Sequence, residues 1–314
     1  MLELSGWFGI FAFSLFVLIR ASDVFTDRAE IVGRFFGLSP FAIGVVIVAV
    51  GTSLPELTSS LLAVLQGSPE IVIGNVLGSN IANIFLIIGL TATIGKKIVL
   101  DYEIASIDLP LFLGTTLLTT LMVASGGFTL GEAILSIVAY IVYLLYSISQ
   151  RHHAEEIPFD TSRLDRLPKR ALLVLALSVV FIFFGADYTV RSVIEISRLL
   201  DVSPEIVAVS ALALGTSLPE LTVSVMCARK GKPEVAVGNV IGSNIFNALM
   251  VLGIPRLFGP LIISEQSIQD GLLQMLAGTL LLCIVVQDKQ ITKWEGCLFL
   301  LFYVWFLGDI FGVL

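Results

Sequence analysis

The sequence predicts an all-α polytopic membrane protein with ten transmembrane helices in two inverted five-helix repeats. Three observations predict this fold: a very apolar composition, ten apolar segments of membrane-spanning length, and two motifs that recur in the second half of the chain. Of the 314 residues, 56% are hydrophobic and 14% are charged, whereas soluble domains carry about 25% charged residues. The net charge of −7 also argues against nucleic acid as a partner, because phosphate binding needs a basic surface.

The apolar segments fit helices that cross a bilayer. A hydrocarbon core about 30 Å thick needs about 20 apolar residues per helix. Because the segments are continuously apolar rather than alternating, a membrane β-barrel is disfavoured. The expected spans are 5–22, 40–65, 71–94, 106–124, 132–149, 169–187, 204–228, 233–255, 268–287 and 294–312.

The basic residues predict how these spans are oriented. The loops that follow the odd-numbered spans carry 15 of the 18 Lys and Arg residues. Such loops face the cytoplasm according to the positive-inside rule. We therefore expect a multi-pass protein of the cell (inner or plasma) membrane, with both termini on the extracytoplasmic side.

Two motifs occur twice in the chain at the same spacing. GTSLPEL begins at residues 51 and 215, and GNV(L/I)GSN begins at 74 and 238, so both pairs are 164 residues apart. We expect a first five-helix repeat at 1–150, a cytoplasmic linker at 151–168 and a second repeat at 169–314. Because five is an odd number, the second repeat enters the membrane from the opposite side, as in secondary transporters.

Each GTSLPEL motif places a glutamate deep in an apolar run. An ionisable group at that depth costs at least a few kcal/mol unless it is neutralised. No Lys or Arg lies near the middle of any span, so the simplest partner for Glu56 and Glu220 is a bound cation. The alternative is a protonated glutamate with only a hydrogen-bonding role, which the symmetric repetition disfavours.

Neighbouring residues add oxygen ligands around each glutamate. Thr52 and Ser53 precede Glu56 by four and three residues, which places the three side chains on one helical face. The same spacing relates Thr216 and Ser217 to Glu220. The proline before each glutamate is expected to kink its helix and to free backbone carbonyls, such as those of Ala49 and Ala213.

The third and eighth spans each carry a polar stripe. It consists of Asn75, Ser79 and Asn83 in the third span and of Asn239, Ser243 and Asn247 in the eighth. Two roles fit these side chains: they bind cations, or they form hydrogen bonds between helices. The glycine pairs Gly74/Gly78 and Gly238/Gly242 predict close helix packing.

The expected ligands are all hard oxygen atoms, with no Cys or His placed among them. This set disfavours Zn²⁺ and Cu²⁺ and suits Ca²⁺ or Na⁺. Two carboxylates can hold one Ca²⁺, a few Na⁺ or protons, but not Ca²⁺ and a full monovalent load together. Competition of this kind predicts exchange rather than co-transport.

The duplicated motifs GTSLPEL and GNVLGSN resemble those of the calcium/cation antiporter superfamily, and are most similar to its prokaryotic Na⁺/Ca²⁺ exchangers. The resemblance covers nearly the whole chain. It implies ten helices, a central site between spans 2, 3, 7 and 8, long first and sixth helices that slide against the rest, and Ca²⁺ export by alternating access. Na⁺ and Ca²⁺ are the implied transported ions.

The resemblance also implies a ligand set for these ions. Its Ca²⁺ ligands are Glu56, Glu220 and the carbonyls of Thr52 and Thr216, and Asn83 and Asn247 line the centre. The flanking Na⁺ ligands are Ser53, Ser79 and the Ala49 region on one side, and Ser217, Ser243 and the Ala213 region on the other. In the K⁺-dependent branch of the family an Asp stands in place of Asn247, so we expect no K⁺ requirement.

Other functions fit the sequence less well. Protonation of Glu56 or Glu220 leaves H⁺/Ca²⁺ exchange, or exchange of another cation, as the alternative. A channel filter normally forms at a symmetry axis between subunits, whereas this chain carries its own pseudo-symmetry. An enzyme is not expected, because the chain has no membrane-embedded HExxH and no Ser/His or paired-Asp arrangement. We expect no cofactor, no obligatory protein partner, and only inorganic cations and the lipid bilayer as partners.

Overall fold

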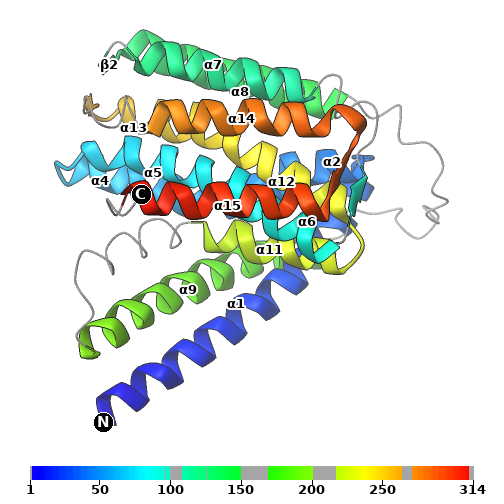
Figure 1. The fold of residues 1–314 in the computed structure, drawn as a ribbon, viewed down its shortest axis with the longest axis vertical. Helices are drawn as coiled ribbons and strands as arrows, with labels where there is room; N and C mark the ends of the chain where they lie inside the picture. The colour runs from blue at the N-terminus through cyan, green and yellow to red at the C-terminus, as the bar shows by residue number, and fades with distance from the viewer. Residues whose placement is uncertain are drawn as a thin grey trace.

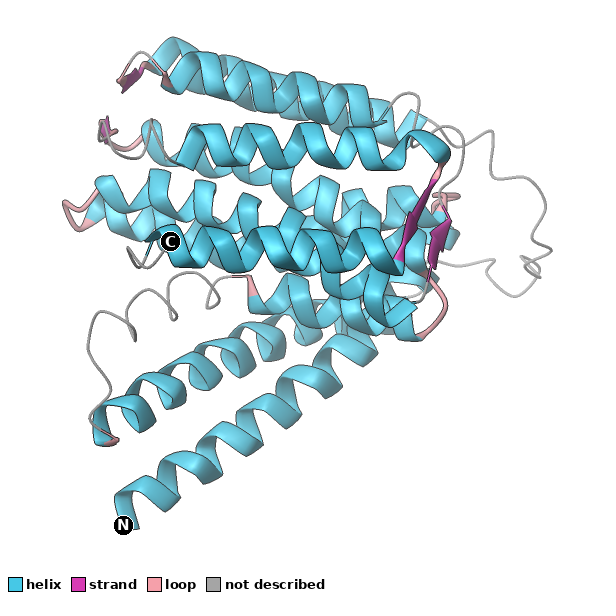
Figure 2. Cartoon of the chain, viewed as in Figure 1, coloured by secondary structure: helices cyan, strands magenta, loops and turns pink. Residues whose placement is uncertain are grey.

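A computed structural model describes residues 2–95, 97–99, 108–124, 126–149, 169–200, 217–263 and 271–310. The described chain is mainly helical, and two short strand pairs lie at opposite ends of the helical bundle (Figure 1, Figure 2). The elements of the first half are α1 (Leu2–Phe35), α2 (Pro40–Ile43), η1 (Gly44–Val48), α3 (Ala49–Thr52), α4 (Leu54–Leu65), α5 (Glu70–Ala82), η2 (Asn83–Ile88), α6 (Gly89–Gly95), β1 (Lys97–Val99), α7 (Leu109–Val123), β2 (Gly127–Phe128) and α8 (Leu130–Ser149). Those of the second half are α9 (Lys169–Leu199), α11 (Leu218–Arg229), α12 (Pro233–Phe246), η6 (Asn247–Val251), α13 (Leu252–Arg256), β3 (Leu261–Ile262), α14 (Leu273–Val285), η8 (Val286–Asp288), β4 (Gln290–Thr292) and α15 (Lys293–Ile310).

The helices confirm the predicted all-α membrane fold. Six helical stretches of the described chain are long and apolar enough to cross a membrane, judged by length and composition. The shorter helices α7, α11, α14 and α15 stand at the four remaining predicted spans. The N-terminal part of the seventh predicted span, up to residue 216, and the predicted linker at 151–168 lie outside the described residues.

The first and sixth helices are longer than the apolar pattern predicts. The predicted spans end at residues 22 and 187, but α1 continues to Phe35 and α9 to Leu199, which confirms the long first and sixth helices that the family resemblance implies. Asp23 and Asp187 therefore lie within helices rather than at their ends. Charged residues end an apolar run without ending a helix when they pair along it, as Asp187 does with Arg191 at 2.9 Å.

The helices that carry the repeated motifs form the centre of the bundle. In their most apolar windows, 94% of the residues of α12–α13 and 78% of those of α5–α6 are buried, against 22% for α1 and 28% for α9. Helices α1 and α9 lie side by side and inclined to the other helices (Figure 1). The bundle therefore has a buried centre and one peripheral helix pair.

The strand pairs show the relation between the two repeats. In the β1–β4 pair, Lys97 lies opposite Thr292, and in the β2–β3 pair, Leu261 lies opposite Phe128. The 164-residue offset of the motifs converts the first pairing into the second, since 97 maps to 261 and 128 maps to 292. The pairs lie at opposite ends of the bundle, as an inverted repeat requires (Figure 2).

Glycines allow α12 to pack against the segment from α2 to α3. A Cβ added to Gly238 would lie 2.4 Å from the backbone oxygen of Phe41, and one added to Gly242 would lie 2.7 Å from Cβ of Ala49. The predicted role of this glycine pair in close packing is confirmed. For Gly74 and Gly78, the equivalent partner segment at 205–213 lies outside the described residues.

An ion-pair network joins α1 to the turn between α11 and α12. Lys230 Nζ lies 2.7 Å from Oδ1 of both Asp23 and Asp27, and Lys232 pairs with Glu30. In the first repeat, uncharged Gln66 and Ser68 stand at the positions equivalent to the two lysines. The network therefore belongs to one end of the bundle, which is the cytoplasmic end in the predicted orientation.

Replacing Lys230 by glutamine should lower the melting temperature by a few degrees at pH 8. Partial burial lowers the pKa of the Lys230 ammonium, but hydrogen bonds and attraction from Asp23 and Asp27 outweigh it and raise the pKa above the usual 10.5. Stability that depends on a raised lysine pKa is present below the usual value and is lost as the pH rises through the raised one.

The difference in melting temperature between the wild type and Lys230→Gln should accordingly persist to about pH 10 and shrink above it. Thermal unfolding in detergent over this pH range measures the difference, with Lys169→Gln, at an exposed position, as the matched control. Equal melting temperatures at pH 8 would show that the network contributes nothing to stability.

Candidate functional site

The motif GTSLPEL interrupts its helix and starts a new one. Between α3 and α4, Ser53 has φ −90° and ψ 4°, and Pro55 and Glu56 are the second and third residues of α4. Ser217 has almost the same angles, φ −88° and ψ 4°, directly before α11. Proline is tolerated in a first helical turn, where its missing N–H is not needed. A carboxylate is favoured there by the helix dipole.

The expected effect of the proline on Ala49 is wrong. The carbonyl of Ala49 is not freed, because it accepts the Ser53 N–H at 3.0 Å. Pro55 has no N–H, so the carbonyl that loses its helical hydrogen bond is the one four residues earlier, that of Gly51. Ala213, the counterpart of Ala49, lies outside the described residues.

The break also changes how the hydroxyls near Glu56 are used. They do not bond to the Glu56 carboxylate but reach the second repeat. Thr52 Oγ1 donates to Oδ1 of Asn239 at 3.1 Å, and Ser53 Oγ donates to Oε1 of Glu220 at 2.9 Å. The two repeats therefore meet through these side chains.

Both glutamates are buried, with 1% of Glu56 and none of Glu220 exposed. Neither forms an ion pair with a described Lys or Arg. No other described residue donates a hydrogen bond to either carboxylate oxygen of Glu56 or to Oε2 of Glu220. The two carboxylates are thus buried without a counter-charge from the described chain.

Two stripe residues make hydrogen bonds between helices. Asn75 Nδ2 donates to Ser60 Oγ at 2.9 Å, and Asn239 Nδ2 donates to Ser224 Oγ at the same distance. Each amide also reaches the carbonyl of the glutamate in the same repeat, at 3.3 and 3.4 Å. For this pair, the structural alternative predicted for the stripes is confirmed.

The other stripe residues surround the buried centre. Ser79, Ser243, Asn83 and Asn247 are all buried. Asn83 and Asn247 begin the π-helical segments η2 and η6, and such segments are frequent at functional sites. Asn83 is held by a hydrogen bond from its Nδ2 to Oδ1 of Asn244 at 2.9 Å, whereas the amide of Asn247 has no described partner.

The predicted site contains an unusual number of buried oxygen atoms without hydrogen-bond donors in the described chain. Buried polar atoms normally have partners, so a group of unpartnered acceptors indicates that something else binds them. Carboxylate, hydroxyl and amide oxygens are the ligands that Ca²⁺ and other hard cations take. The atoms are both carboxylate oxygens of Glu56, Oε2 of Glu220, Oγ of Ser217 and Ser243, and Oδ1 of Asn83 and Asn247.

The structure describes ten of the twelve predicted site residues and adds two that were not predicted. Thr216 and Ala213 lie outside the described residues. Asn80 and Asn244 were not predicted, although they are buried and bond across the repeat interface. The signal was available, because both asparagines belong to the duplicated GSN sequence.

By fold and site, the protein belongs to the class of inverted-repeat membrane transporters with a buried, oxygen-rich centre. A family model described as "Sodium/calcium exchanger protein" matches residues 6–149 and 170–310. The chain belongs to this sodium/calcium exchanger family.

Individual proteins are similar to this chain over most of its length. The sodium/calcium exchanger MaX1 of Methanosarcina acetivorans is 33% identical, over 98% of this chain and 99% of its own. The inner membrane protein YrbG of Escherichia coli is 32% identical, over 78% of each chain. A solved structure of the sodium-calcium exchanger NCX_Mj, soaked with 10 mM Na⁺ and zero Ca²⁺, superposes with a TM-score of 0.85 at 30% identity, covering 98% of this chain and 99% of that one.

Family membership establishes the general activity. The chain is a multi-pass membrane exchanger of inorganic cations rather than a catalytic enzyme, and Na⁺ and Ca²⁺ are the ions that the family exchanges.

Proposed function

We propose that this protein is a secondary antiporter that exports Ca²⁺ from the cytoplasm in exchange for Na⁺ by alternating access. The observation that carries the proposal is the group of buried, unpartnered oxygen atoms around Glu56 and Glu220. Two carboxylates carry two negative charges, which one Ca²⁺ neutralises. Na⁺ ions that enter the same centre compete for the same charge, so the two cations occupy it in turn and are exchanged.

We further propose which residues bind the ions. Glu56 and Glu220 bind Ca²⁺ together with the backbone carbonyls at the two helix breaks, and Na⁺ occupies the flanking positions. This arrangement is supported by the C-terminal end of α3, because carbonyls at such a helix end can coordinate cations. The full proposed set is Glu56, Glu220, Thr52, Thr216, Ser53, Ser217, Ser79, Ser243, Asn83, Asn247, Ala49 and Ala213. For Ala49 the proposal uses the second lone pair of its carbonyl oxygen, because the first accepts the Ser53 N–H.

The proposed organisation places repeats at 1–150 and 169–314, joined by a cytoplasmic linker at 151–168, with both termini outside the cytoplasm. The location of 15 of the 18 basic residues supports this orientation. The relative YrbG is named an inner membrane protein, which supports the cell membrane as the location.

Helices α1 and α9 move as one unit in this mechanism. Two contacts support their movement together. A Cβ on Gly185 would lie 2.9 Å from the backbone nitrogen of Leu18, and Thr189 Oγ1 donates to Ser14 Oγ at 3.0 Å. Close backbone approach and a buried hydrogen bond hold the two helices to each other.

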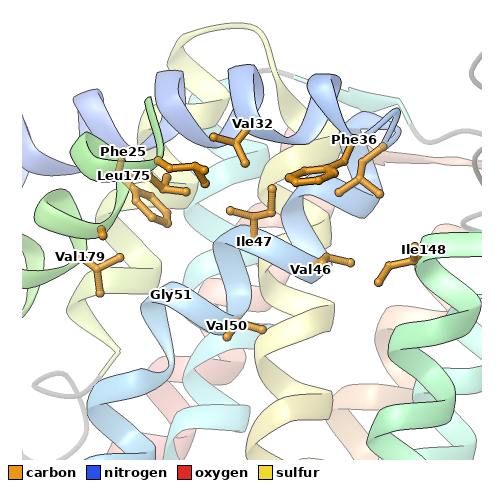
Figure 3. Close-up of a pocket in the computed structure, with 13 residues that line it drawn as sticks. Phe25, Val32, Phe36, Val46, Ile47, Val50, Gly51, Ile148, Leu175 and Val179 are labelled. Atoms are coloured by element: carbon orange, nitrogen blue, oxygen red, sulfur yellow. The ribbon is translucent and has the colours of Figure 1, made fainter. Parts of the chain in front are cut away.

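The surface that this pair presents to part of the bundle is apolar. A groove of about 500 Å³ separates α1 and α9 from η1 and α3, and Phe25, Ile47 and Val179 are among the side chains that line it (Figure 3). The apolar side chains on this face have no directional bonds to break, so packed helices can shift along it. The ion pairs of α1 with Lys230 and Lys232 lie elsewhere and have to break or move with the pair. The groove thus supports a sliding movement of α1 and α9.

A flux assay tests the proposed coupling. Purified protein in Na⁺-loaded proteoliposomes should take up radioactive Ca²⁺ when the outside is free of Na⁺, and a Na⁺ ionophore should abolish the uptake. Replacing K⁺ by choline should leave the rate unchanged, because Asn247 adds no third carboxylate to the centre.

The same assay separates the alternatives. Uptake that follows an imposed pH gradient and ignores the Na⁺ gradient would replace Na⁺ coupling by H⁺ coupling. Uptake without any gradient dependence would contradict exchange altogether.

A further inference from the structure

Two asparagines outside the proposed ligand set meet at the interface between the repeats. Asn80 Nδ2 donates to the backbone carbonyl of Asn244 at 3.2 Å, and Asn244 Nδ2 donates to the carbonyl of Asn80 at 3.4 Å. Their sequence positions differ by 164, which is the repeat offset. Because each residue contacts its own counterpart, this contact lies on the pseudo-two-fold axis that relates the repeats.

The contact occurs where both central helices change their winding. The N–H of Asn83 donates to the carbonyl of Asn80, and that of Asn247 donates to the carbonyl of Asn244, at the points where η2 and η6 begin. Each of these carbonyls therefore accepts a second donor from the opposite repeat. The pair fixes the two backbones directly before the residues that face the centre.

The side-chain oxygens of the pair are used unequally. Oδ1 of Asn244 accepts the amide of Asn83 at 2.9 Å. The equivalent bond would run from Nδ2 of Asn247 to Oδ1 of Asn80, and neither atom has a described partner.

A second hydrogen bond at the centre has the same asymmetry. Ser53 donates to Glu220, whereas Ser217 has no described partner for its hydroxyl and does not donate to Glu56. In both cases the donor comes from the first repeat and the acceptor from the second. The two bonds are therefore asymmetric in the same sense.

We propose that Asn80 and Asn244 are positioning residues that act alternately: Asn244 orients Asn83 in the state described here, and Asn80 orients Asn247 in the oppositely facing state. The inference rests on alternating access as proposed above. In inverted-repeat transporters the two repeats exchange conformations when the site changes its facing direction. The Asn83–Asn244 bond is then replaced by an Asn247–Asn80 bond of the same chemistry, so its loss is compensated during turnover.

Orientation matters for cation binding because an amide has two different ends. Its oxygen attracts a cation, whereas its NH₂ group offers only donors. Asn244 accepts a hydrogen bond from Nδ2 of Asn83 and so fixes the rotation of that amide group. The Oδ1 atom of Asn83, which has no described partner, is thereby held in one orientation. Removing the acceptor lets the amide rotate and weakens binding in the one state that uses it.

Matched variants on the two sides of the axis test this proposal. We compare Asn80→Ala and Asn244→Ala in Na⁺-loaded right-side-out and everted vesicles, and measure kcat and KM for Ca²⁺ uptake at each membrane face. Each variant also loses the bond from its Nδ2 to the opposite backbone carbonyl, and this loss is common to both variants. The bond that distinguishes them is the one to Asn83 or to Asn247, and its loss should raise KM about five-fold, which corresponds to about 1 kcal/mol. Asn244→Ala should raise KM at one face and Asn80→Ala at the other, with smaller changes in kcat.

The outcomes distinguish positioning from general stabilisation. If both variants raise KM at the same face, or equally at both faces, the alternating role is overturned. If the wild-type protein shows no Na⁺-dependent Ca²⁺ uptake, the proposed function fails instead. Should the alanine variants fold poorly, Asn80→Ser and Asn244→Ser also lack the amide oxygen, leave a smaller gap and give the same two-sided comparison.

Discussion

Replacing Glu56 by glutamine should reduce Ca²⁺ transport at least about 100-fold at limiting Ca²⁺. Breaking a buried charge pair by removing one partner costs about 3 kcal/mol or more, which is a factor of about 100 or more in affinity. Glutamine keeps the size of the side chain but removes one of the two negative charges that balance Ca²⁺. Both carboxylate oxygens of Glu56 lack a described hydrogen-bond partner, so no other described group compensates for the loss.

The same substitution should stabilise the protein in the absence of bound ions. A buried amide costs less than a buried, unpaired carboxylate, so the melting temperature of Glu56→Gln in ion-free detergent should rise rather than fall. Glu70→Gln, at an exposed position at the start of α5, is the matched control and should leave both quantities unchanged. Wild-type Ca²⁺ uptake by Glu56→Gln would refute the assignment of the site.

Introducing a side chain at Gly238 should have the second-largest effect. The new Cβ of Gly238→Ala would lie 2.4 Å from the backbone oxygen of Phe41 and 3.1 Å from Cα of Gly44. Backbone atoms at these distances have to move, and overpacking of this kind costs about 1–3 kcal/mol. The melting temperature should therefore fall by several degrees.

Gly238→Ala should weaken transport as well as stability. The new Cβ pushes α12 away from the α2–α3 segment, and both of these segments hold proposed ligands. Helix α12 carries Ser243, and the α2–α3 segment leads to Ser53, so displacement of one against the other moves the proposed site apart. Gly114→Ala in α7 is the control, because its added Cβ has no atom within 4 Å. The apparent Ca²⁺ affinity should fall only for Gly238→Ala, and an unchanged affinity would show that α12 and α3 tolerate separation.

Much of the fold could be predicted from sequence because membrane helices obey simple rules. The apolar runs at 40–65 and 233–255 correspond to helical stretches at Pro40–Leu65 and Pro233–Arg256. The ends of the first and sixth helices could not be predicted in this way. Charged residues reveal where a helix leaves the hydrocarbon core, but a helix whose charges pair along its length continues beyond that point.

The candidate site divides in a similar way. The identities of Glu56 and Glu220 follow from their cost in an apolar run, which needs no structure. The partners of individual asparagines do not, because Asn75 and Asn83 lie on the same stripe and yet have different roles. Asn75 bonds to α4, whereas Asn83 reaches across the repeat axis to Asn244. Such choices depend on which helix lies opposite each turn.

The length of α1 has a consequence for the role of the lipid. A helix of 34 residues is about 51 Å long, whereas the hydrocarbon core measures about 30 Å. Tilting alone cannot absorb this difference at ordinary angles, so part of α1 extends into the headgroup region, where its charged residues between Asp23 and Arg34 belong. Lipid headgroups and dissolved ions, rather than hydrocarbon, therefore surround the part of α1 that pairs with Lys230 and Lys232.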